Sequence, residues 1–572
     1  LAYNFNRAKV AWYQIDNVFV SPNGDDLSSQ VLSDANNNWY SYSFLQTDLF
    51  PNSQPQLMQQ PMRTFDLAFY PDQRGPYNFD TEGRIGISSG IDGRGRLKDP
   101  ETRWGGVMRN LEGGLKDFER SNVEFFEFWV LDPFIENPDN TGDLYLNFGN
   151  ISEDVLRDAH QQFENGLPGP NVSTTLFESV WGSTPVIRPL VDGFGFNETR
   201  TAQDIGLDGL TDSLERNEFK EYYDYISAKI PNNDPLINAE LENKLDDPAG
   251  DNYKFFRDNS FRSLEENPNF DPPISYVAER YKNFNGPQGN SPIQQDNKIN
   301  AFSTSGTQRP DTEDLNNDNT LNDSEGYLEY RIPMHANMQI GETPYLANIN
   351  ISSIKNSDGS VKGTVKWYYF RVPIKNPTNQ VGAVTIRNIE SMRMYMTNFK
   401  QPVVMRFARL NLVRNNWRKY TQSLFEEGEY LPDDNVTDSY FEMSSINFEE
   451  NGGRSPIPYV IPPGIIRENL PSFNNISVLQ NEQSIQLQVG QLKDGEGKGV
   501  FKKVDVDMRQ FKNLEVFVHA ESLNNPIQGN CEDLENGAVA AFIRIGDDFQ
   551  NNFYEYEIPL KVTIPQHYEP SS

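Results

Sequence analysis

The stretch SNVEFFEFWV, Ser121–Val130, combines aromatic and apolar residues with two glutamates, and a second stretch of the same kind, LYLNFGN, follows at Leu144–Asn150. Short alternating stretches like these recur along the 572 residues and are separated by Asn, Asp, Gly and Pro. This pattern is typical of β-strands joined by long loops. The sequence therefore predicts a mainly β fold with a few short helices.

Two parts of the chain resemble each other strand by strand. SNVEFFEFWV is similar to KNLEVFVHAE at Lys512–Glu521, and each is followed by an alternating stretch, LYLNFGN in one case and AFIRIGD in the other. KWYYFRVPIK and NFYEYEIPLK form a third matching pair. The repetition predicts two jelly-roll-like β-sandwich units. In the second unit, we expect alternate residues such as Leu514, Val516 and Val518 to pack against a facing sheet.

These repeats set the predicted domain boundaries. We expect the second sandwich to lack its last strands. The predicted parts are a loop-rich β region at 1–120, a first sandwich at 121–170 with 326–420, an inserted mixed region with calcium-type loops at 171–325, a linker at 421–474, and a second sandwich at 475–572.

Two stretches predict short amphipathic helices. In SEDVLRDAHQQFENG, Ser152 is placed as the N-cap and Gly166 is placed to end the helix. In DSLERNEFKEYYDYI, Asp212 and Glu215 have the spacing of a capping box. Both helices are interpreted as supports for the sandwich.

The charge balance limits the partners. The chain has 50 Lys and Arg against 82 Asp and Glu, so its net charge is −32 with neutral histidine. Such a surface repels phosphate groups, so we expect neither nucleic acid nor anionic membrane headgroups as partners. The 7 Trp, 26 Tyr and 37 Phe predict large folded cores rather than a disordered acidic chain.

One cysteine, Cys531, allows no internal disulfide, so that any cross-link must come from packing or from metal ions. The sequence starts LAYNF without an initiator methionine, and we expect an internal piece of a longer protein.

The stretch DLNNDNTLNDSE at 314–325 has the spacing of a calcium-binding loop of the EF-hand type. Asn319 stands at position 6, where the turn needs a positive φ that Asn tolerates. The alternative is an Asx-rich turn that caps itself with bonds from side chains to the backbone. The candidate calcium ligands, at positions 1, 3, 5, 7, 9 and 12, are Asp314, Asn316, Asp318, Thr320, Asn322 and Glu325.

DIGLDGLTDSLE at 204–215 is a weaker candidate for calcium. It lacks a ligand at position 3, where Gly206 stands, and Glu215 is also expected in the helix cap. A helix cap without an ion is the favoured alternative. The candidate ligands are Asp204, Asp208, Asp212 and Glu215.

No catalytic constellation is predicted. GISSG at Gly86–Gly90 matches the GxSxG motif of a nucleophile elbow. The elbow needs a helix directly after it, and the Gly-rich stretch that follows cannot begin one. Glu124 and Glu127 are three apart on a strand, face opposite sides and cannot flank one glycosidic bond. We therefore expect a protein that is not an enzyme.

Several longer motifs resemble the SprA family, also called Sov: RGPYNFD, RWGGVMR, NVEFFEFWVLDPF, FENGLPG, FNGPQGNSP and DMRQFKNLEVFVHAE. They follow the family order over essentially all 572 residues. Members of this family are giant outer-membrane translocons of the type IX secretion system in Bacteroidota and are linked to gliding motility.

The resemblance implies a soluble, non-membrane portion of the translocon, part of the cap or vestibule of the pore, which supports export of folded cargo and gliding adhesins. It implies no catalytic residues. It places the chain at the outer membrane, with the extracellular face favoured over the periplasm. Implied partners are a PorV-type outer-membrane barrel, a plug protein and secreted cargo, with the piece itself monomeric. The alternative is a cell-surface carbohydrate-binding or adhesion module.

Overall fold

We analysed a computed structural model of the chain. The described residues are 2–19, 27–53, 61–157, 160–164, 175–179, 182–187, 208, 210–229, 247–250, 252–253, 255–284, 291–292, 313–356, 358–425, 439–454, 457–470, 478–504, 506–522, 534–549 and 551–563.

The chain is mainly β, as predicted, with 37% of residues in strands against 15% in helices. Its contacts divide it into two compact units. Unit 1 comprises Leu1–Ser43 and Met62–Val413, and unit 2 comprises Phe44–Pro61 and Arg414–Ser572. The domain boundaries drawn from the sequence remain a prediction.

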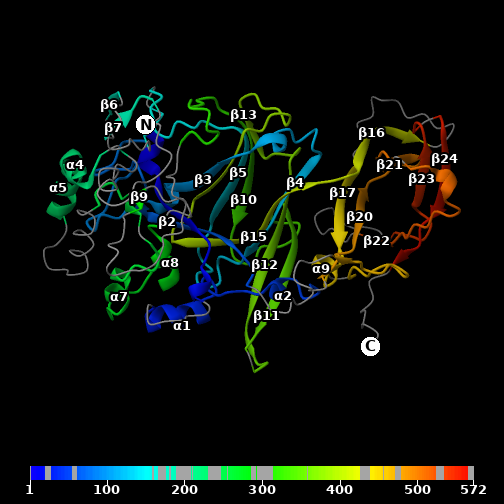
Figure 1. Cartoon of the computed structure of the whole chain (residues 1–572), viewed down its shortest axis with the longest axis horizontal. Coiled ribbons are helices and arrows are strands. Elements are labelled where there is room, and N and C mark those ends of the chain that lie inside the picture. The colour runs from blue at the N-terminus through cyan, green and yellow to red at the C-terminus, as the bar shows by residue number, and fades with distance from the viewer. Residues whose placement is uncertain are drawn as a thin grey trace. The chain divides into compact units, whose positions relative to one another are not determined.

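Unit 1 contains a six-stranded sheet assembled from distant parts of the chain (Figure 1). The pairs β1–β2, β2–β15, β4–β12 and β12–β11 are antiparallel. The β11–β12 hairpin extends beyond the neighbouring strands. In sheet order the strands are β1 (Ala8–Tyr13), β2 (Phe65–Arg74), β15 (Val403–Arg414), β4 (Val123–Leu131), β12 (Val361–Pro373) and β11 (Leu346–Lys355).

A five-stranded antiparallel sheet forms the second layer. Its central strand, β5, pairs with β10 on one side and with β14 on the other. In sheet order the strands are β13 (Asn379–Val381), β10 (Gly326–Met334), β5 (Gly142–Asn150), β14 (Ser391–Thr397) and β3 (Trp104–Asn110).

The core of unit 1 lies between the two sheets. Phe126 on β4 meets Phe148 on β5 with ring centroids 5.5 Å apart, which joins the layers. Phe128 on β4 is fully buried against Phe370 and Phe407, with centroids 5.4 and 5.5 Å away. Alternate residues of the longer strands, such as Leu144, Leu146 and Phe148 of β5, point into this cluster, because side chains on a strand alternate between the two faces. The two sheets thus pack face to face, and three of their strands, β1, β2 and β3, come from residues before 121.

Short helices accompany unit 1. Tyr13 on β1 stacks on Tyr281 of α8 with centroids 4.5 Å apart, and Arg280 of α8 forms a buried ion pair with Glu265 at 2.5 Å. The helices and small strands are η1 (Ala2–Asn6), η2 (Asn17–Phe19), α1 (Ser29–Asn37), η3 (Pro100–Thr102), η4 (Gly113–Leu115), β6 (Leu176–Ser179), β7 (Gly182–Pro185), α4 (Asp212–Glu218), α5 (Lys220–Lys229), β8 (Asn252–Tyr253), α7 (Ser260–Glu265), α8 (Tyr276–Tyr281) and β9 (Ser291–Pro292).

Unit 2 consists of two-stranded pairings and short helices in its described residues. The pair β22–β25 is parallel and the other four are antiparallel. The elements are α2 (Gln46–Leu49), β16 (Arg418–Phe425) with β21 (Glu496–Phe501), β17 (Tyr440–Asn447) with β20 (Gln483–Gly490), α9 (Phe448–Asn451), β18 (Asn469–Leu470) with β19 (Val478–Leu479), η5 (Met508–Gln510), β22 (Ala520–Glu521) with β25 (Val562–Thr563), and β23 (Ala540–Gly546) with β24 (Phe553–Pro559).

The burial expected for Leu514, Val516 and Val518 is wrong. These side chains are 60%, 53% and 48% exposed. The segment around them is extended but belongs to no named strand before β22 starts at Ala520, so among the described residues it has no facing sheet to pack against.

The helix expected to begin at Ser152 is also absent, since residues 151–157 are described and none is helical. The Glu153 side chain accepts the distant backbone N–H of Leu315, the Asp154 side chain accepts that of Arg157, and Arg157 adopts a φ of +49°. These contacts replace the continuous backbone bonds that a helix needs.

The helix expected from Asp212 is present as α4 and α5, which meet at Phe219. The proposed capping box is wrong. Thr211 occupies the N-cap position, and the Glu215 carboxylate accepts the backbone N–H of Ala249 at 2.9 Å. The Glu215 side chain, which the sequence pattern predicts to cap the helix, thus binds the distant backbone N–H of Ala249.

Replacing Phe128 by Ala should destabilise unit 1 by about 3–5 kcal/mol, because a large fully buried ring leaves a cavity. Val361→Ala is the matched control on β12, since Val361 is 61% exposed, and should cost under about 1 kcal/mol. Urea denaturation measures both values. Equal effects of the two substitutions would contradict the packing described.

Candidate metal centre

Two loops meet at one end of the five-stranded sheet. Asn150, the last residue of β5, pairs with Gly326, the first residue of β10. Because the strands are antiparallel, the chain leaving β5 and the chain entering β10 lie side by side. The segments 151–157 and 313–325 are therefore held together by strand register.

Glu153 forms hydrogen bonds with the segment 313–325. Its backbone N–H donates to the carbonyl of Asn322 at 2.7 Å. Its carboxylate accepts the backbone N–H of Leu315 at 3.0 Å and that of Asn322 at 3.1 Å, so that one buried side chain closes both ends of the loop. Burial raises the pKa of Glu153, and the amide bonds oppose that rise.

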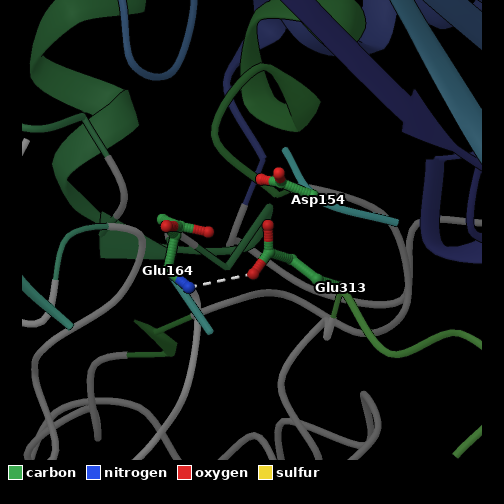
Figure 2. A group of neighbouring side chains, drawn as sticks. All are labelled: Asp154, Glu164 and Glu313. Atoms are coloured by element: carbon green, nitrogen blue, oxygen red, sulfur yellow. Dashed lines mark hydrogen bonds between the residues drawn. The ribbon is translucent and has the colours of Figure 1, made fainter. Parts of the chain in front are cut away.

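Three further carboxyl groups converge beside this loop and are named here the acidic cluster: Asp154, Glu164 and Glu313 (Figure 2). They are 7%, 0% and 3% exposed, and one oxygen of each lies within 4.8 Å of the others. Glu313 accepts the backbone N–H of Val155 at 2.8 Å and that of Glu164 at 2.9 Å. A divalent cation could be held here, since oxygen ligands from carboxylates suit calcium and magnesium.

The electrostatics of the acidic cluster are unfavourable without a counter-charge. Burial, reinforced by the Glu164 carboxyl group, raises the pKa of Glu313 well above its usual value. Proton uptake or a cation would relieve the repulsion between these groups.

Arg7, near the start of the chain, lies among three aromatic rings beside this region. The Arg7 guanidinium lies 5.0 Å from the Trp104 ring centroid, 5.3 Å from that of Tyr77 and 5.7 Å from that of Tyr3. Arg7 also donates to the carbonyl of Val155 at 3.4 Å. Its charge interacts with that of Glu313.

The structure places the predicted calcium loop in a self-bonded conformation. Asp314 accepts the amides of Asp318 and Asn319 at 3.1 and 2.9 Å, and Asn319 has the expected positive φ, +65°. Asp318 accepts the amide and hydroxyl of Thr320, which lowers the pKa of Asp318.

Of the remaining three side chains, two bond within the loop and one bonds outside it. Asn316 accepts the amide of Asp318 at 2.8 Å. Asn322 accepts the amide of Ser324 at 2.9 Å. Glu325, expected to close the calcium site at position 12, instead forms an ion pair with Arg157 at 2.7 Å. The calcium assignment itself remains a prediction.

The weaker loop is only partly described. Asp204 lies outside the described residues. Asp208 is buried and accepts the amide of Leu210 at 2.9 Å. Asp212 and Glu215 come together with Asp247, so these three can also supply ligands to one ion.

Sequence reasoning missed the acidic cluster because its members come from segments more than 140 residues apart. Asp154 and Glu164 were assigned to a helix, and Glu313 stood one residue before the recognised loop. Knowledge of the strand pairing would have predicted the cluster. Once β5 lies beside β10, the residues that follow 150 lie close to the residues that precede 326.

A family model matches much of the chain. Residues 222–571 match the model of the SprA_N family, described as motility related/secretion protein, which is more than half of the chain. The chain belongs to the SprA_N family. No curated protein matches it.

The SprA_N match includes α5, the 313–325 loop and every later strand, from β10 to β25. This chain is therefore a motility and secretion protein, and that class fits a place in the cell envelope. Among the described parts of this SprA_N chain, no helix is both long and apolar enough to cross a membrane.

Glu313→Gln tests the acidic cluster in this SprA_N chain. The unfolded glutamate titrates near 4.5, whereas the pKa in the folded state is higher. The contribution of the Glu313 carboxyl group to the free energy of unfolding is therefore fully present below about pH 4.5. It is lost as the pH rises through the folded pKa. Relative to the natural chain, Glu313→Gln should gain about 1–3 kcal/mol between pH 4 and pH 8.

Urea denaturation with added chelator at both pH values measures this difference. Glu342→Gln, at an exposed position, is the control and should show no such trend. A relative stability of Glu313→Gln that is constant or falls with pH would show that the buried carboxyl is not the destabilising group.

Proposed function

We propose that this chain is a non-membrane portion of the outer-membrane translocon of type IX secretion, where it forms part of the cap or vestibule of the pore. In that role it supports export of folded cargo and of gliding adhesins. The observation that carries the proposal is the SprA_N match over residues 222–571. The proposed partners are a PorV-type barrel, a plug protein and the secreted cargo.

The surface charge supports a role beside a wide aqueous path. With a net charge of −32, the chain keeps its surface hydrated and repels acidic folded proteins. A cap or vestibule needs this property, because cargo must pass without adhering. The compact sandwich of unit 1, with its continuous aromatic core, supplies a rigid wall.

The extracellular location is tested by protease access on intact cells. A cleavage site inserted at Gly359, in the exposed turn of the β11–β12 hairpin, should be cut by protease added outside, because nothing lies within 4 Å of a side chain there. A periplasmic reporter with the same site is the control. Cleavage only after the outer membrane is permeabilised would place the chain in the periplasm.

We also propose that calcium stabilises the 314–325 loop. Asp314, Asn316 and Asp318 fit the first three ligand positions, and the backbone turns at Asn319 as such a loop requires. Glu325 fits only after it leaves Arg157, to which it is bound. Arg157 therefore competes with the ion for the last ligand.

Thermal unfolding with calcium or with chelator tests this proposal. Calcium at about 100 times its dissociation constant should stabilise the chain by about 2.7 kcal/mol. Arg157→Gln should lower the calcium concentration needed, whereas Glu325→Gln should raise it. A melting temperature that neither calcium nor chelator changes would remove structural calcium from this loop.

A further inference from the structure

Residues Gly83–Lys98, named here the basic loop, carry a local charge opposite to that of the chain. They contain Arg84, Arg94, Arg96 and Lys98 against one acid, Asp92, so the local sum is 4 − 1 = +3. All four cations are exposed. Glu82 and Asp99 flank the loop at its two ends, so the sum over residues 82–99 is 4 − 3 = +1.

The tip of the basic loop is apolar and fully open to solvent. Ile85 is 106% exposed and Ile87 is 37% exposed. Gly86 stands between them with a φ of +76° and nothing within 4 Å of a side chain at its position. An isolated isoleucine on a surface is ordinary, but a complete isoleucine side chain at the apex of a turn beside four cations is not explained by folding.

The tip is held by hydrogen bonds rather than left loose. Arg84 and Ser88 bond to each other in both directions, at 2.7 and 3.0 Å, and Asn6 donates to the carbonyl of Ile87 at 2.8 Å. Arg103, which is fully buried, donates to Ser88 Oγ at 2.9 Å and to the carbonyl of Lys98 at 2.7 Å. The apolar apex is thus presented in a fixed position, which limits the ordering cost of binding.

Internal contacts occupy the cations only in part. The Arg84 guanidinium lies over the Phe5 ring, 3.9 Å from its centroid. Arg96 pairs with Asp72 at 3.3 Å while its side chain remains 59% exposed. Asp92 accepts the amides of Arg94 and Arg96 at 2.8 and 2.9 Å, so this acid also closes the turn between them.

We propose that the basic loop is a contact site for an anionic lipid surface, with Ile85 entering the headgroup layer and the four cations meeting the lipid phosphates. Charge at physiological salt acts over about 8–10 Å, so the loop responds to the surface it touches and not to the net −32 of the whole chain. Each cation near an anionic membrane favours binding, and an exposed apolar side chain adds the hydrophobic part. A nucleic acid would use the cations but would leave Ile85 in water.

Vesicle sedimentation with the whole chain tests the proposal. The natural chain should bind vesicles that contain phosphatidylglycerol at low salt and should stay in solution with pure phosphatidylcholine. Arg84→Gln with Arg94→Gln and Lys98→Gln should lower the affinity about 100-fold, at about 5-fold for each charge. Arg387→Gln with Arg509→Gln and Lys362→Gln removes the same charge elsewhere and should leave binding within about 3-fold.

A second pair of variants separates the apolar contact from the charge. Ile85→Ser should lower vesicle affinity about 10-fold, whereas Ile351→Ser, at a position 63% exposed on β11, should not change it. Circular dichroism of each variant checks that the fold is kept. No vesicle binding by the natural chain, or equal loss in the basic-loop and control variants, would overturn the proposal. Binding to an acidic peptide without binding to vesicles would also overturn it.

Discussion

The pairing of β5 with β10 is the constraint on which the rest of unit 1 depends. It joins Gly142–Asn150 to Gly326–Met334 over nine residue pairs and closes the long excursion between residues 150 and 326. The pairing also fixes which side chains face the core, because a shift by one residue would turn Leu144, Leu146 and Phe148 away from the opposite sheet. The register is therefore held by the packing of the aromatic core.

The same pairing brings together the buried carboxyl groups of the acidic cluster. Once Asn150 and Gly326 are neighbours, Glu153, Asp154 and Glu313 are brought together and buried. Backbone amides satisfy part of their charge, which is how buried carboxylates are usually tolerated. The remaining repulsion within the acidic cluster makes this end of the sheet sensitive to protons and cations.

Local patterns predicted the strands well and the loops poorly. VEFFEFWV and LYLNFGN became β4 and β5 because alternation on a half-buried surface is a property of the segment itself. Glu215 failed as a cap residue because its carboxylate binds a distant backbone group, the N–H of Ala249. Ser152 failed because residues 151–157 are not helical. The acidic cluster could not be found from spacing, since its members are neighbours only after β5 and β10 pair. The Asp314 loop was found because its residues are consecutive.

Disulfide trapping measures the register of β5 against β10 most directly. In a Cys531→Ser background, Tyr145→Cys with Arg331→Cys places two thiols on directly opposed residues of β5 and β10. Mild oxidation should cross-link this pair rapidly, and Tyr145→Cys with Tyr327→Cys, four residues out of register, should not cross-link. Cross-linking of the second pair in preference to the first would contradict the register and with it the placement of the acidic cluster.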